Sequence, residues 1–89
     1  MATDDGVAQK VPNARTLKEA HEALARVRPK QNAPLQAWLT FRQTAVALYT
    51  RIADIDRFHH HEALYWVERE QEEVNQIKAR IGAEQSSQQ

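Results

Sequence analysis

The residues Asp54-Ile55-Asp56-Arg57-Phe58-His59-His60-His61-Glu62 decide the fold, because they lie in the middle of a helical pattern and include no helix breaker. From Leu35 to Ile81 the chain has neither glycine nor proline. Steps of seven residues keep one phase across the histidines, through Leu39, Val46, Ala53, His60, Val67, Val74 and Ile81. This phase favours one long or kinked helix over about residues 34–81. The alternative is a helical hairpin that turns near residues 54–58, with Asp54 or Asp56 capping the second helix.

A shorter helix is predicted upstream, over about residues 15–28. Thr16 and Glu19 have the spacing of a capping box, in which the glutamate reaches back to the amide of the capping residue. Pro29 ends this helix, because the residue before a proline avoids helical geometry. Pro34 suits the first turn of the next helix. The sequence therefore predicts an all-α fold.

The 89 residues allow one domain, which we place at residues 13–82. Residues 1–12 and 83–89 are predicted to be disordered tails, because they offer few apolar side chains to a core. Gly82 is expected to end the last helix. A helical domain this small has a marginal core, and the absence of cysteine excludes disulfides. A partner chain, a histidine/carboxylate metal site or very good packing must then supply the missing stability.

The apolar surface of the predicted long helix changes in width along its length. Between residues 35 and 55 it covers more than half of the circumference, whereas between residues 60 and 81 it narrows to a seam that suits one partner helix. These features predict a homodimeric bundle or antiparallel coiled coil. The residues expected to contact a second copy or another protein are Tyr65, Trp66, Val67, Val74, Ile77 and Ile81.

The histidine cluster has two interpretations. His59, His60 and His61 fan over about 200° of a helix, so only subsets can cooperate. A divalent transition metal such as zinc could be bound by His60, Asp56, His59 and His21. Alternatively, Asp56 and His60 form a polar layer that fixes helix register. The second interpretation is favoured because the sequence shows no established helical metal motif, and no cofactor is expected.

Two further features concern charged residues. Arg42 interrupts the apolar surface, and we expect it to pair with Asp54, Asp56 or Glu22. The acidic run is predicted to be a solvated face, and it consists of Glu68, Glu70, Glu72 and Glu73.

The overall charge argues against several classes of protein. The chain has 12 basic and 12 acidic residues and a formal net charge of zero, so nucleic acid binding is not expected. Because the first helix is basic, a DNA-binding regulator remains the second alternative.

The sequence has no catalytic signature, which indicates that the protein is not an enzyme. It also lacks an export signal or an apolar run long enough to span a membrane, which predicts a cytoplasmic protein.

Two stretches, residues 15–24 and residues 55–66, resemble a group of short, uncharacterised actinobacterial proteins. The resemblance runs from about Arg15 to Ile81 and implies an accessory or regulatory partner in an actinobacterial cytoplasm. It implies no activity. The leading interpretation is a non-enzymatic helical interaction or regulatory module that acts through self-association and protein partners, and the first alternative is a metal-binding protein.

Overall fold

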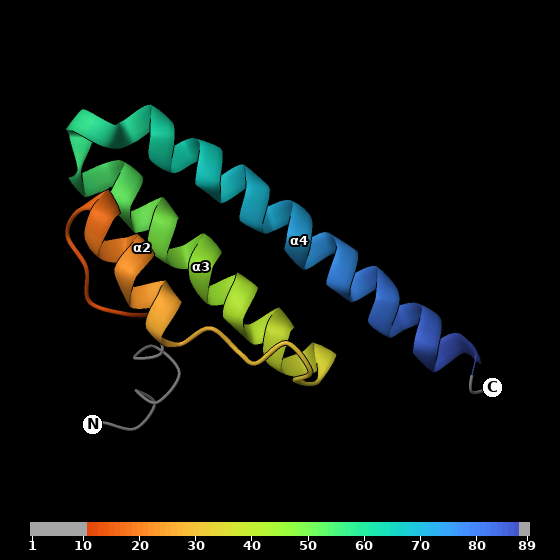
Figure 1. Cartoon of the computed structure of the whole chain (residues 1–89). Helices are drawn as coiled ribbons and strands as arrows, with labels where there is room; N and C mark the ends of the chain where they lie inside the picture. Colours follow the sequence, from red (N-terminus) through yellow and green to blue (C-terminus); the bar gives the residue numbers. More distant parts are fainter. Residues whose placement is uncertain (1–10, 88–89) are drawn as a thin grey trace, which may run out of the picture.

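The computed structural model describes residues 11–87, which form three α-helices and one 3-10 turn. In chain order these elements are α2 (Leu17–Arg26), α3 (Leu35–Ile55), η1 (Arg57–His59) and α4 (His60–Ser87). α3 and α4 run antiparallel as a hairpin, and α2 packs along one side of it (Figure 1). Residues 11–87 contain no strand, so the predicted all-α fold is confirmed.

α2 begins as its sequence indicates. The Thr16 hydroxyl accepts a hydrogen bond from the Glu19 amide at 3.1 Å, which satisfies one of the free amides of the first turn. The Glu19 carboxylate accepts from the Arg15 amide at 2.8 Å, one residue before the expected Thr16 amide. Leu17, Ala20 and Leu24 are buried, so the predicted apolar stripe is the face that packs on the hairpin.

The preferred continuous helix is wrong, and the alternative hairpin is confirmed. α3 ends at Ile55, Asp56 leaves helical geometry with φ −100° and ψ 73°, and α4 begins at His60 after the three residues of η1. The turn needs no glycine, because no described residue has a positive φ. The hairpin is favoured because it buries the apolar faces of α3 and α4 against each other after closing only a short loop.

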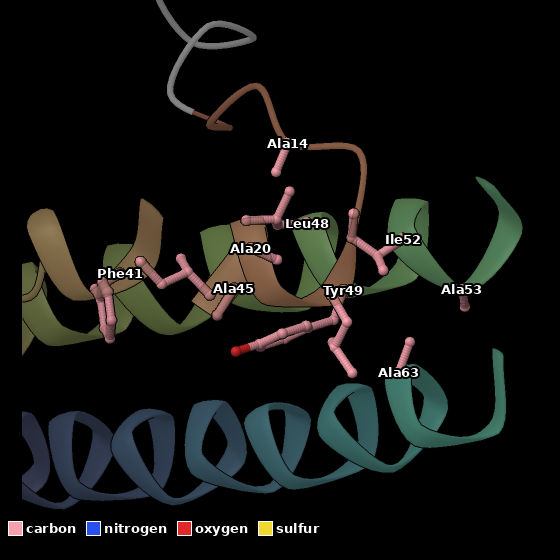
Figure 2. Packing of buried hydrophobic residues seen from close by; sticks show 11 residues of the cluster. Ala14, Ala20, Phe41, Ala45, Leu48, Tyr49, Ile52, Ala53 and Ala63 are labelled. Carbon is pink, nitrogen blue, oxygen red and sulfur yellow. The ribbon is translucent and has the colours of Figure 1, made fainter. Parts of the chain in front are cut away.

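The main core lies where all three helices meet, and it is centred on Leu48 and Ile52, which are fully buried. Figure 2 shows Tyr49 reaching from α3 toward α4, where Ala63 points back. This cluster consists of Ala14, Leu17, Ala20, Leu24, Phe41, Ala45, Leu48, Tyr49, Ile52, Ala53 and Ala63.

A second, smaller cluster joins the far ends of α3 and α4. Val74 and Ile77 of α4 pack against Leu39 of α3, with Ile81 partly buried at the margin. The narrow seam that predicts a partner helix is therefore covered by α3 of the same chain. The seven-residue apolar repeat continues across the turn because its residues on α3 and its residues on α4 pack against each other in the hairpin.

The predicted ends of the domain also differ from the structure. α4 continues through Gly82 to Ser87, so residues 83–87 are helical rather than a disordered tail. Gly82 is exposed and does not adopt the left-handed conformation that would end the helix. Of the predicted N-terminal tail, residues 1–10 lie outside the described residues, whereas Val11 packs against the core and the Pro12 carbonyl accepts from Arg51. Residues 88–89 also lie outside them.

Candidate functional site

The three consecutive histidines have different partners. His59 Nδ1 lies 3.0 Å from Asp56 Oδ2, His60 Nδ1 lies 2.7 Å from the Ala53 carbonyl oxygen, and His61 is exposed, with its ring against that of His60. The carboxylate and the carbonyl oxygen only accept, so both Nδ1 atoms donate. The register interpretation predicts that Asp56 pairs with His60. This pairing is wrong, because Asp56 pairs with His59 and His60 bonds to the Ala53 carbonyl.

Asp56 also connects the turn to α2. Its Oδ2 atom accepts a hydrogen bond from the Leu17 amide at 2.9 Å. This bond, followed by the one with His59, lowers the pKa of Asp56 below its ordinary value. The carboxylate is thus the side chain that joins the first turn of α2 to the α3–α4 turn, and it remains ionised at neutral pH.

His21 lies away from the consecutive histidines, on the inner face of α2. Its Nδ1 atom is 2.7 Å from the Tyr49 hydroxyl, and its ring meets that of Trp66 at 5.1 Å. His21 and His59 nevertheless line the same open groove, of about 370 Å³, to which Glu22 and Glu62 also contribute. Within residues 11–87, no three histidine or carboxylate side chains are placed to hold a metal ion together.

Arg42 and Glu70 form an ion pair between α3 and α4 that the sequence interpretation missed. Arg42 Nη1 lies 3.0 Å and 3.3 Å from the two Glu70 carboxylate oxygens, and Glu70 is only 9% exposed. The expected pairing of Arg42 with Asp54, Asp56 or Glu22 is therefore wrong. So is the assignment of Glu70 to a solvated face. Heptad spacing could have indicated that Glu70 is buried, because Glu70 lies seven residues from both Ala63 and Ile77, which are buried.

Aromatic rings surround this ion pair. The Arg42 guanidinium lies 5.4 Å from the centroid of Trp38 and 5.5 Å from that of Phe41. Tyr49 stacks on Trp66 with centroids 5.9 Å apart. Burial, and to a lesser degree the charge of Glu70, raises the pKa of Tyr49 to about 12, so its hydroxyl keeps its proton at neutral pH.

The three helices leave a space at this point, which we call the junction hollow. Its volume is about 230 Å³. The residues that line it are His21, Leu24, Ala25, Arg28, Phe41, Arg42, Tyr49, Trp66 and Glu70. The hollow therefore combines aromatic walls with the largely buried Arg42–Glu70 ion pair and the exposed Arg28.

The predicted protein-contact residues separate into two groups. Val74 and Ile77 are 2% and 7% exposed, and Trp66, Val67 and Ile81 are partly buried against the two core clusters. Only Tyr65, at 53%, is well exposed.

Two exposed apolar side chains near Tyr65 were not expected. Phe58 in η1 is 92% exposed, and Leu64 is 40% exposed. Periodicity places Leu64 in the narrow apolar seam of residues 60–81, and its exposure shows that this placement is wrong. Phe58 lies outside the seam, so periodicity could not single it out. With Tyr65, three large exposed apolar side chains therefore lie within residues 58–65, at the turn and the beginning of α4.

No protein-family model matches this chain, and comparisons with curated proteins and with solved structures found no similar protein. Among the described residues, the helices lack a segment with the length and hydropathy needed to cross a membrane.

Proposed function

We propose that this protein is a non-enzymatic helical interaction module that self-associates through the exposed face at the beginning of α4. The observation that carries the proposal is the exposure of Phe58, Leu64 and Tyr65 within eight residues of one another. Burying a large apolar side chain stabilises a complex by about 1.5–3 kcal/mol. Three exposed side chains of this size within residues 58–65 therefore favour association.

The position of this face follows from helical geometry. Residues of α4 are 100° apart, and Ala63 and Glu70 mark the side that packs on α3. His61, Leu64, Tyr65 and Glu68 are all exposed and lie on the opposite side of the helix. We call these four residues the outer face. A helix of another chain can approach the outer face without displacing α3.

The polar side chains of the outer face fit a second copy of the chain in antiparallel orientation. A two-fold axis between Leu64 and Tyr65 sets each Leu64 beside Tyr65 of the other copy. The same axis brings His61 opposite Glu68 of the other copy, twice in the dimer. The zero net charge of the chain adds no long-range repulsion between copies.

The paired segment is short, and this sets the strength of the association. Residues 60–72 of α4 span about 20 Å of helix, so we expect an interface at the lower end of the range for specific complexes. The dimer should therefore form and dissociate readily, with a dissociation constant of about 10⁻⁵ to 10⁻⁴ M. Such an association suits a regulatory module that responds to its own concentration.

A charge-swap experiment tests the pairing by sedimentation velocity over a range of concentrations. His61→Glu brings like charges together at two places in the dimer and should weaken association by roughly tenfold. The double variant His61→Glu with Glu68→Lys should restore it. Positions 61 and 68 are two turns apart within one helix, so this rescue requires contact between copies.

The control is Gln76→Glu, which makes the same change of charge on α4 beyond the paired segment and should leave association unchanged. A wild-type chain that stays monomeric at about 1 mM, where an association of about −4 kcal/mol is half complete, contradicts the proposal. Failure of the double variant to recover would contradict the antiparallel register.

Zinc binding is the second candidate function, favoured by one observation in the groove between α2 and α4. His21 and His59 each have Nδ1 engaged, by Tyr49 and by Asp56, which leaves both Nε2 atoms free. Metal-bound histidines are commonly held in this way. Glu22 and Glu62 line the same groove and are exposed, so their side chains can rotate toward an ion.

Calorimetric titration with zinc, at a concentration where the chain is monomeric, tests this candidate. Stoichiometric binding that is lost in His59→Ala and retained in His61→Ala would support it. Equal loss in both variants, or no heat of binding, would exclude it.

A further inference from the structure

We propose that the junction hollow binds a small aromatic carboxylate, that is, a single planar ring that carries one negative charge. The volume of the hollow is about 230 Å³. For comparison, an apolar cavity of about 150 Å³ holds benzene. A ring with one carboxylate attached therefore fits, whereas a nucleotide or a fused-ring cofactor is too large.

The walls of the hollow favour a planar ring. Tyr49 and Trp66 stack with an interplanar angle of 25°, and His21 meets both rings edge-on. Phe41 adds a further aromatic side chain from α3. Aromatic groups attract one another in stacked and edge-to-face geometries, so this set of rings recognises an aromatic ligand better than an aliphatic one.

The charges that line the hollow favour an anion. Two guanidinium groups, of Arg28 and Arg42, line it, but only one carboxylate does, that of Glu70. Glu70 is paired with Arg42. Arg28 lies over the rings of Trp38 and Phe41, at 5.1 Å and 6.0 Å, and has no carboxylate partner among residues 11–87. One positive charge therefore remains without a counterion at the hollow.

The hydrogen-bonding groups at the hollow favour the same class of ligand. Arg28 lines the hollow and its guanidinium carries only donors. A carboxylate can accept from these donors, whereas an amine cannot accept from them and would also be repelled by the excess positive charge.

Three ligands that share one ring but differ in charge test whether binding depends on the ring alone or also on the carboxylate. Benzoate, benzyl alcohol and benzylamine are titrated into the full-length protein while the indole N–H signal of Trp66 is followed by NMR. Benzoate should shift this signal with saturation at millimolar concentration, and benzyl alcohol should bind at least about tenfold more weakly because it lacks the charge-assisted hydrogen bonds. Benzylamine should cause no saturable shift.

Two variants locate the binding site. Arg28→Gln removes the uncompensated charge from an exposed side chain, so the fold is kept, and benzoate affinity should fall about tenfold. Arg26→Gln is the matched control, because Arg26 lies two residues away and does not line the hollow. Ala25→Leu adds bulk at the hollow without changing charge and should also abolish benzoate binding.

Three outcomes would overturn the proposal. They are the absence of a saturable benzoate shift at about 10 mM, equal affinity for benzoate and benzyl alcohol, and equal loss of affinity in Arg28→Gln and Arg26→Gln. The first would mean that water alone occupies the hollow. None of these outcomes affects the self-association proposed above, because the outer face of α4 lies on the opposite side of that helix.

Discussion

The carboxylate of Asp56 accepts a hydrogen bond from the amide of Leu17 at 2.9 Å, across 39 residues of sequence. Leu17 is the first residue of α2, and Asp56 is the capping residue that directly follows α3. An anion near the beginning of a helix satisfies a free amide and interacts favourably with the helix dipole. This bond therefore couples the position of α2 to the geometry of the hairpin turn.

Asp56→Ala should weaken the attachment of α2. The variant leaves the Leu17 amide without its acceptor and removes the partner of His59. We expect the melting temperature to fall by about 5 °C, as for loss of a helix cap in a small domain. Thermal unfolding followed by circular dichroism measures the change. Asp54→Ala, an exposed residue of the same helix, is the control and should have little effect.

Acidification should remove the contribution of the Asp56 charge. The pKa of Asp56 is lowered in the folded protein, so its contribution to stability is complete above the unfolded-state value of about 4 and is lost as the pH falls through the lower folded value. Asp56→Asn keeps an acceptor but does not titrate. The difference in melting temperature between wild type and Asp56→Asn should therefore shrink below about pH 4. A difference that stays constant down to pH 2 would show that the charge contributes nothing.

Glu70→Ala should be strongly destabilising. It leaves the Arg42 guanidinium, whose side chain is 17% exposed, without its carboxylate. Breaking one partner of a buried pair costs about 3 kcal/mol, whereas replacing both by leucine restores most of the loss because no unpaired charge remains. Urea unfolding of Glu70→Ala, of the double leucine variant and of Glu72→Ala, which is exposed, tests this. Equal stability of Glu70→Ala and Glu72→Ala would contradict it.

Leu48→Ala and Leu64→Ala should have different consequences, although the chemical change is the same. Leu48 is fully buried, so its truncation leaves a cavity and should lower the free energy of unfolding by about 3 kcal/mol. Leu64 is 40% exposed on the outer face of α4, so its truncation should change the stability of the monomer by less than about 1 kcal/mol but weaken the dimer. Urea unfolding at low concentration and sedimentation velocity at high concentration separate the two effects.

Several parts of this structure could be predicted because they depend on local sequence. The beginning of α2 follows from Thr16 and Glu19, whose hydrogen bonds lie within one helical turn. The buried stripe of α2 follows from the spacing of Leu17, Ala20 and Leu24. By contrast, Glu70 looks like its exposed neighbours in the acidic run, and only its position opposite Arg42 on α3 makes it a buried ion pair.

The helical character of the chain, the beginning of α2 and the face that α2 buries follow from local sequence, because helix caps and apolar periodicity act between residues a few positions apart. The turn at Asp56 and the partner of each charged side chain depend on how the helices pack. Pairings such as Asp56 with Leu17 and Arg42 with Glu70 join residues that are distant in sequence, and their energies depend on burial and approach distances that arise only when the helices pack.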